Sequence, residues 1–205
     1  MIKTIFFDFD GVLTLDKTGT ISTCNFFYKK YNIDYDTLLY SFRKNNKKLT
    51  LGLSTYGQLW DEICGDIGCD IPISDLAEAF LDTPINFHVI NIAVNLSANS
   101  YKIGIITDNK WDRMEAIVLK YNLSSVFDPI VVSANIGVSK GSKEIFEYAM
   151  KLTGNAPEEC LFIDNTKKNL EVPNQLGMHT YYYKLEGSGL EGLINYFMEL
   201  NIYCI

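Results

Sequence analysis

Near its amino end the chain reads Lys3-Thr4-Ile5-Phe6-Phe7-Asp8-Phe9-Asp10-Gly11-Val12-Leu13-Thr14, a short apolar run that ends at two aspartates and a glycine. The run predicts a strand buried on both faces, because such strands are continuously hydrophobic. Asp8 and Asp10 follow it directly, at the strand end where open parallel sheets carry their chemistry. Two carboxylates there are costly to desolvate unless a cation or a reaction uses them. The alternative interpretation is an ordinary polar turn of the Asp-Gly type.

Similar apolar runs recur after residue 86, and they alternate with segments whose apolar residues have helical spacing. This alternation predicts an α/β fold: a doubly wound, Rossmann-like parallel sheet with helices on both faces. The further predicted strands are residues 101–106, 130–132, 160–165 and 179–183, and the predicted helices are residues 86–97, 111–121, 142–152, 166–176 and 190–200.

Between residues 15 and 85 the pattern changes, because helical spacing continues but no strand-like run occurs. Ser54 or Thr55 is expected to cap one helix of this region, and Ser74 another. We therefore predict two parts, an α/β core formed by residues 1–14 and 86–205 and an inserted α-helical cap domain formed by residues 15–85.

The chain of 205 residues has 25 acidic and 18 basic side chains and a formal net charge of −7. This balance argues against nucleic acid as a partner, since such binding depends on clustered Lys and Arg. No stretch approaches the roughly 20 apolar residues of a membrane span, and the amino end does not resemble a signal peptide. The five cysteines are scattered without a CxxC pair, which favours reduced thiols. We therefore expect a cytoplasmic protein with neither a nucleic acid nor a membrane partner.

Four polar motifs occur in a fixed order along the chain. Residues 8–14 fit the pattern DxDGVLT, and residues 106–109 (Ile-Thr-Asp-Asn) form a hydroxyl motif. Residues 133–140 fit SxxxGxxK, and residues 162–165 together with Asn169 form an acidic motif. In this order, and across the whole chain, the motifs resemble those of the haloacid dehalogenase-like hydrolase superfamily, in its phosphatase branch with a helical cap.

The resemblance implies a role for each acidic residue. Asp8 would attack phosphorus and form an aspartyl-phosphate, and Asp10 would protonate the leaving alcohol and then activate water. The Asp8 side chain, the Asp10 backbone carbonyl and Asp164 would bind Mg²⁺, an ion that prefers hard oxygen ligands and keeps part of its water.

The resemblance also implies contacts to the substrate. Lys140 and Thr107 would bind the phosphoryl oxygens as catalytic groups, the first as a fixed positive charge and the second as a hydroxyl donor. Asp108 and Asn109 are expected to take part in substrate binding as well. Because an acid facing a phosphate is repulsive, we expect the Asp108 side chain to point away or to contact the cap loop. Lys143 is the other lysine near this place, but it lies inside the predicted helix.

These residues together predict a Mg²⁺-dependent phosphatase that acts on a small phosphorylated metabolite. A sugar phosphomutase and a catalytically weakened binding protein remain alternatives, because Asn165 stands where family members often have a second acid. Asp10 disfavours a dehalogenase, which would lack that acid. The basic run at residues 43–48 is either a solvated helix end or a guide for a phosphorylated substrate. The sequence does not determine the oligomeric state.

Overall fold

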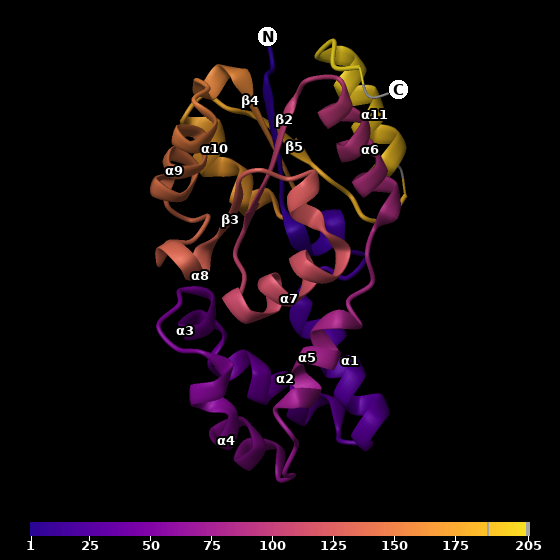
Figure 1. The fold of residues 1–205 in the computed structure, drawn as a ribbon, viewed down its shortest axis with the longest axis vertical. Coiled ribbons are helices and arrows are strands. Elements are labelled where there is room, and N and C mark those ends of the chain that lie inside the picture. Colours follow the sequence, from indigo (N-terminus) through magenta and orange to yellow (C-terminus); the bar gives the residue numbers. More distant parts are fainter. Residues whose placement is uncertain (188, 204–205) are drawn as a thin grey trace.

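The computed structural model describes residues 1–187 and 189–203, which form a sheet flanked by helices above a second group of helices (Figure 1). Within these residues five parallel strands form one sheet in the order β3-β2-β1-β4-β5. Helices α6 and α11 lie on one side of the sheet, and α9 and α10 lie on the other (Figure 1). The predicted doubly wound α/β fold is confirmed.

Helices and short turns connect the strands close to the predicted positions. The strands are β1 (Thr4–Phe7), β2 (Lys102–Thr107), β3 (Ile130–Val132), β4 (Cys160–Asp164) and β5 (His179–Tyr182). The helices are α1 (Gly19–Tyr31), α2 (Tyr35–Lys44), α3 (Asn46–Thr50), α4 (Tyr56–Ile67), α5 (Ser74–Leu81), α6 (Phe87–Ala98), α7 (Trp111–Tyr121), α8 (Ser133–Ile136), α9 (Lys143–Thr153), α10 (Glu171–Gln175) and α11 (Gly189–Glu199). Short helical turns are η1 (Phe9–Leu13), η2 (Leu123–Ser125), η3 (Pro157–Glu159) and η4 (Lys167–Leu170).

Strand β1 lies at the centre of the sheet, and its side chains alternate between two apolar cores. Ile5 and Phe7 belong to a core shared with α6, α7 and α11, whereas Phe6 belongs to a core shared with α9. All three side chains are fully buried, which explains the continuous hydrophobicity of this strand. Because β1 pairs with β2 on one side and with β4 on the other, the carboxyl ends of these three strands are neighbours.

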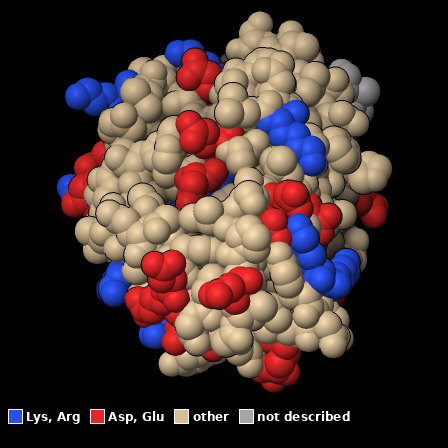
Figure 2. Space-filling model, turned by 60° about the horizontal axis from the view of Figure 1, so that its bottom comes forward, with Lys and Arg blue, Asp and Glu red and all other residues tan. Residues whose placement is uncertain are grey.

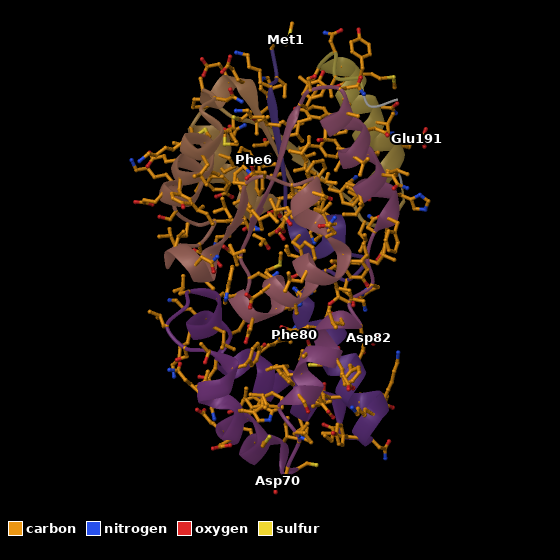
Figure 3. The ribbon with its side chains drawn as sticks, viewed as in Figure 1. Met1, Phe6, Asp70, Phe80, Asp82 and Glu191 are labelled. Atoms are coloured by element: carbon orange, nitrogen blue, oxygen red, sulfur yellow. The ribbon has the colours of Figure 1, made fainter. Side chains whose placement is uncertain are left out.

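Helices α1, α2, α4 and α5 enclose a third apolar cluster, separate from the two sheet cores. Its centre is aromatic: Phe27 stacks on Phe42 with ring centroids 5.7 Å apart, and Phe80 belongs to the same cluster. Figure 3 shows Phe80 among these helices and Phe6 within the sheet. On this basis we propose the division into a cap of residues 15–85 and a core of residues 1–14 and 86–205.

The structure corrects one predicted helix cap and one predicted helix, whereas Thr55 caps α4 through a capping box with Gln58. Ser74 is the first residue of α5 and not its cap, because the chain enters this helix through a tight turn from Pro72, whose carbonyl already accepts from Asp75. The helix predicted over residues 166–176 is divided into η4 and α10. Pro173 lies in the first turn of α10, where its missing N–H would have no helical partner in any case.

The surface carries charges of both signs. The face in Figure 2 shows acidic side chains interspersed with basic and uncharged ones. Among the described residues, no helix has the length and hydropathy required to cross a membrane. The thiols of Cys24, Cys64, Cys69 and Cys160 are free, and Cys204 lies outside the described residues.

Candidate active site

A pocket of about 230 Å³ lies at the carboxyl edge of the sheet. Five of the predicted site residues line it together: Asp8, Asp10, Thr107, Asp108 and Lys140. They come from the ends of β1 and β2 and from the loop before α9. The neighbouring strand ends therefore assemble, from distant parts of the chain, the polar cluster that the sequence motifs predict.

Lys140 joins the carboxylates that follow β1 and β4. Its Nζ lies 2.8 Å from Asp8 Oδ1 and 2.7 Å from Asp164 Oδ2, and all three side chains are at least nine-tenths buried. Burial raises the pKa of Asp8 to about 8. The negative charge of Asp164 adds to this rise, whereas the positive charge of Lys140 opposes it. Burial disfavours the Lys140 ammonium, but the two carboxylates outweigh this and raise its pKa. Lys143, by contrast, is exposed and pairs with Glu147 on α9.

The two carboxylates are held in place by further hydrogen bonds. Asp8 Oδ1 accepts from the Phe9 backbone N–H at 2.7 Å. Asp164 Oδ1 accepts from the Thr166 backbone N–H at 2.7 Å, and Asn169 Nδ2 donates to both Asp164 oxygens at 3.2 and 3.1 Å. Such supporting bonds fix the side-chain rotamers and keep both acids directed at the same point.

Of the two positions expected for Asp108, pointing away or contacting the cap loop, the structure shows no bond to the cap loop among the described residues; the side chain contacts the loop that carries Lys140. Its Oδ1 accepts from the backbone N–H of Lys140 at 2.9 Å, and burial raises its pKa. One carboxylate oxygen is therefore used to position the loop that carries Lys140. Because this hydrogen bond offsets part of the negative charge of Asp108, the repulsion expected between Asp108 and a phosphate is reduced.

The turn after β1 requires Gly11 and packs against Asn165. Gly11 has φ +78°, a backbone conformation that side chains with a Cβ rarely adopt. A Cβ atom there would lie 1.9 Å from Asn165 Nδ2. Asn165, which departs from the family pattern, thus contacts the turn that places Asp8 and Asp10, and it also lines the pocket.

Asp10 is held by a buried arginine that the sequence motifs do not reveal. Arg113 Nη1 and Nη2 each donate to one Asp10 oxygen at 2.9 Å. Asn109 Nδ2 also donates to Asp10 at 2.9 Å, while Asn109 Oδ1 accepts from Arg113 at 3.1 Å. Arg113 Nη2 reaches Thr83, close to the end of the cap region, at 3.2 Å. Both polar ends of Asn109 are used within this cluster, so its side chain orients Asp10. Asn109 does not line the pocket, and its contact with substrate stays a prediction.

The sequence gives only a weak indication that Arg113 belongs to the site. It lies in the first turn of α7, directly after the hydroxyl motif, where side chains can point back toward the sheet edge. Arg113 is 1% exposed, and Gly19 packs directly against its guanidinium, since a Cβ at Gly19 would lie 2.2 Å from Cζ. A buried charge of this kind indicates a fixed partner, but the sequence does not say which.

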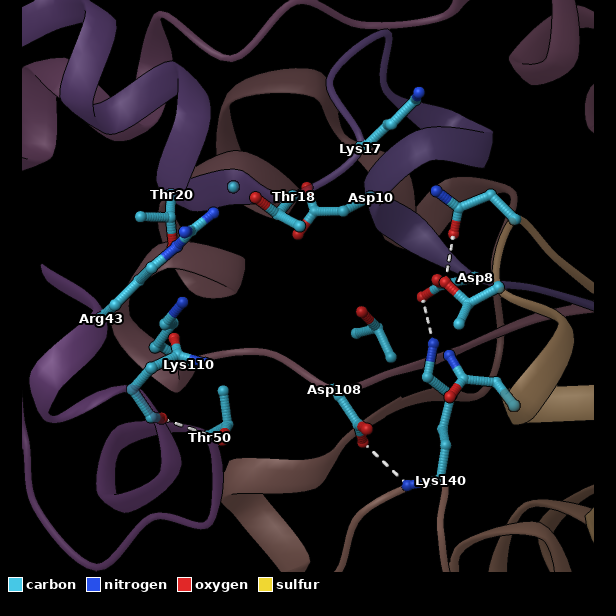
Figure 4. A pocket seen from close by; sticks show the side chains of 16 residues that line it. Asp8, Asp10, Lys17, Thr18, Thr20, Arg43, Thr50, Asp108, Lys110 and Lys140 are labelled. Carbon is cyan, nitrogen blue, oxygen red and sulfur yellow. Dashed lines mark hydrogen bonds and ion pairs between the residues drawn. The ribbon is translucent and has the colours of Figure 1, made fainter. Parts of the chain in front are cut away.

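The other half of the pocket wall comes mainly from α1, α2 and α3 and the loop before them. Arg43, from the basic run, lies in this wall, whereas its neighbour Lys44 points to Glu62 and Asp66, each at 2.9 Å. The basic run is therefore divided between pocket and surface. The wall residues on this side are Lys17, Thr18, Gly19, Thr20, Arg43, Asn46 and Thr50, together with Lys110 from the core (Figure 4).

The buried carboxylates of the pocket offer the hard oxygen ligands that Mg²⁺ prefers. Among residues 1–187 and 189–203, no three His, Cys, Asp or Glu side chains are grouped so that they could hold a metal by themselves. Mg²⁺ usually needs only one or two carboxylates, because water and substrate phosphate complete its coordination. Asp8 and Asp164 converge on one point, and burial raises the pKa of Asp8, an effect that a divalent cation would reverse. These residues fit the ion.

A family model described as haloacid dehalogenase-like hydrolase matches residues 2–177 of the chain. The chain belongs to this family of hydrolases. Among curated relatives, D-ribitol-5-phosphate phosphatase of Bacteroides thetaiotaomicron is 23% identical over 192 residues, covering 88% of this chain and 91% of the relative. Glyceraldehyde 3-phosphate phosphatase of Methanocaldococcus jannaschii is 29% identical over 94 residues, which are 45% of this chain and only 41% of that relative.

Solved structures support the same fold. A haloacid dehalogenase-family enzyme from Bacteroides thetaiotaomicron superposes with a TM-score of 0.74 at 20% identity, covering 94% of this chain and 98% of the other. The same enzyme in complex with magnesium and inorganic phosphate gives a TM-score of 0.70 at 19% identity, covering 91% and 96%. At this identity the likeness establishes the fold.

Proposed function

We propose that the protein is a Mg²⁺-dependent phosphatase that hydrolyses a small phosphorylated metabolite through an aspartyl-phosphate on Asp8. The observation that carries this proposal is the buried cluster in which Lys140 contacts both Asp8 and Asp164 at the pocket floor. A cation fixed beside a carboxylate nucleophile supplies the charge that a phosphoryl group needs. The phosphatases among the relatives, and the fold neighbour that binds magnesium and phosphate, support the same reaction class.

Each residue has a definite task in the proposed reaction. Asp8 Oδ attacks phosphorus and releases the alcohol, and Lys140 neutralises phosphoryl oxygens throughout this step. Asp10 gives the leaving oxygen its proton and afterwards takes a proton from the water that hydrolyses the aspartyl-phosphate. In the proposed reaction Thr107, which is 1% exposed at the end of β2, donates its hydroxyl to another phosphoryl oxygen.

In this proposal the Asp8 side chain, the Asp10 carbonyl and Asp164 bind the metal. Mg²⁺ would neutralise charge on the transferring group and would keep Asp8 ionised at neutral pH. The chain's own residues orient these ligands, since Asn169 and the Thr166 N–H fix Asp164 and Arg113 fixes Asp10.

The test is phosphate release from p-nitrophenyl phosphate and from a panel of sugar and nucleotide phosphates, with Mg²⁺ and with a chelator. We expect metal-dependent release that Asp8→Asn abolishes. Lys140→Met should lower kcat/KM roughly a thousandfold, because one charge pair at ~4 Å is worth about 4 kcal/mol at an effective dielectric of ~20. Lys143→Met, which removes an exposed lysine on the same segment, is the matched control and should retain activity. Unchanged release by Asp8→Asn, or full activity in the chelator, would refute the mechanism.

A further inference from the structure

Lys110 is a buried cation that has no direct acidic contact among the described residues. It is 6% exposed, and its Nζ makes no hydrogen bond or ion pair with any described residue, although it lies in the wall of the active-site pocket. Buried lysines in proteins are normally paired, because an unpaired buried charge is costly. The pocket wall therefore holds a positive charge that Asp10 and Asp112 offset only through their charges, without a direct contact to Nζ among the described residues.

A second cation lies at the same end of the pocket. Arg43 lines the pocket and, among the residues that the structure describes, forms no ion pair, in contrast to Lys44, which has two acidic partners. Figure 4 shows Arg43, Lys110 and Thr20 on one side of the pocket, opposite Asp8 and Lys140. The catalytic lysine is neutralised by Asp8 and Asp164, so the excess positive charge is concentrated on the far wall.

An unpaired acceptor in the same wall provides an independent sign of a missing ligand. The side-chain Oδ1 of Asn46 is buried and has no hydrogen-bond partner among the described residues. Such atoms are rare in native proteins, because each one loses its bonds to water. A hydroxyl group on a bound molecule would satisfy Asn46, and an anionic group would satisfy Lys110.

We propose that Lys110 and Arg43 form a subsite for a second anionic group, a carboxylate or a phosphate, on the leaving-group part of the substrate. This inference rests on the proposed phosphatase function, since it assigns the opposite end of the same pocket. It narrows the substrate class to phosphate monoesters that carry another acid. Burial also lowers the pKa of Lys110 to about 8, which an anion bound beside it would reverse.

The subsite is tested with matched esters of equal chain length. Each set contains a neutral ω-hydroxyalkyl phosphate, the corresponding ω-carboxyalkyl phosphate and the corresponding bisphosphate, in chains of two to five carbons. We expect wild-type kcat/KM for the best anionic ester to exceed that for its neutral counterpart roughly 10- to 100-fold, mainly through KM, as charge-assisted hydrogen bonds imply. Whichever anionic ester is preferred, the carboxyalkyl phosphate or the bisphosphate, shows whether the subsite binds a carboxylate or a phosphate.

Two variants and one control make the result specific. Lys110→Met and Arg43→Gln should reduce the ratio of anionic to neutral kcat/KM toward one. Lys47→Met removes an exposed lysine of the same basic run that does not line the pocket, and it should keep the wild-type ratio. A ratio of one in the wild type, or a high ratio that survives Lys110→Met, would overturn the subsite.

A binding measurement separates failure of the subsite from failure of the proposed function. Calorimetric titration of folded Asp8→Asn protein with the same esters should give tighter binding of the anionic members, lost on adding Lys110→Met. Equal affinity for all members refutes the subsite, even where neutral esters are hydrolysed and the phosphatase function stands. If the wild type hydrolyses none of these esters and none of the phosphates in the earlier panel, the phosphatase function is refuted, whatever the affinities.

Discussion

Replacing Lys110 by Met should stabilise the protein while removing the proposed anion subsite. The methionine keeps an apolar side chain of similar length in the same place but carries no charge. Burial is the main cause that lowers the pKa of Lys110 from 10.5 to about 8; Arg113 adds to the lowering, and the nearby Asp10, Asp112 and Cys24 oppose it. The charged form is therefore less favourable in the folded chain than in the unfolded chain.

The size of the effect follows from this difference in pKa. A shift from 10.5 to about 8 corresponds to about 3 kcal/mol of destabilisation from the charged lysine. Because the folded pKa lies below the unfolded pKa, this cost is fully present below pH 8 and disappears as pH rises to 10.5. At pH 7 we expect Lys110→Met to gain about 3 kcal/mol in free energy of unfolding, or roughly 6–12 °C in Tm for a chain of this size.

Urea unfolding at a series of pH values provides the assay, in a buffer that contains no small oxyanion. The difference between Lys110→Met and wild type should be largest at pH 7 and should shrink toward zero near pH 10.5. Lys47→Met serves as the control for removing an exposed lysine. A variant that is less stable than the wild type, or a difference that does not change with pH, would show that Lys110 is not an unpaired buried charge.

Two further predictions concern the turn and the clamp around Asp10. Gly11→Ala should lower the free energy of unfolding by roughly 2 kcal/mol or more, since it combines a strained φ with a clash against Asn165. Gly154→Ala is the control, because Gly154 has a similar φ but open space around it. It should lower the free energy of unfolding by only about 1 kcal/mol in the same urea titration. Arg113→Met should lower the free energy of unfolding by roughly 3 kcal/mol, because Asp10 loses its ion-pair partner. The same variant should lower kcat for phosphate release at least about tenfold. An unchanged kcat would show that the ion pair between Arg113 and Asp10 does not contribute to catalysis.

Much of the fold was accessible from the sequence because it depends on local patterns. The apolar run that ends at Asp8 predicted the central strand, and the alternation after residue 86 predicted the parallel sheet. The helix caps were less predictable: Thr55 caps α4 as a capping residue should, but Ser74 does not, because the turn from Pro72 already satisfies the first N–H groups of α5.

The motif residues were found because the end of each strand is marked by a distinctive polar sequence. Arg113, Lys110 and Arg43 carry no such mark, since an isolated basic residue on a helix or loop is usually exposed. Their significance comes from burial and from missing or distant partners, which only the three-dimensional structure supplies. Asn109 was placed in the right region, but its bonds to Asp10 and Arg113 depend on side-chain directions that spacing does not determine.

The pairing of β1 also has a consequence for the order in which the chain folds. Thr4 pairs with Lys102 on one side and with Cys160 on the other. The long chain segments between these residues must therefore form closed loops before β1 can pair with either neighbouring strand. Loop closure of this kind slows folding, because its entropic cost precedes the gain from the contacts. During synthesis β1 leaves the ribosome well before β4, so it remains without this neighbour until β4 has also been made. The carboxylate pair that Lys140 joins therefore forms late, and a nascent chain that has not yet reached Asp164 holds no complete site.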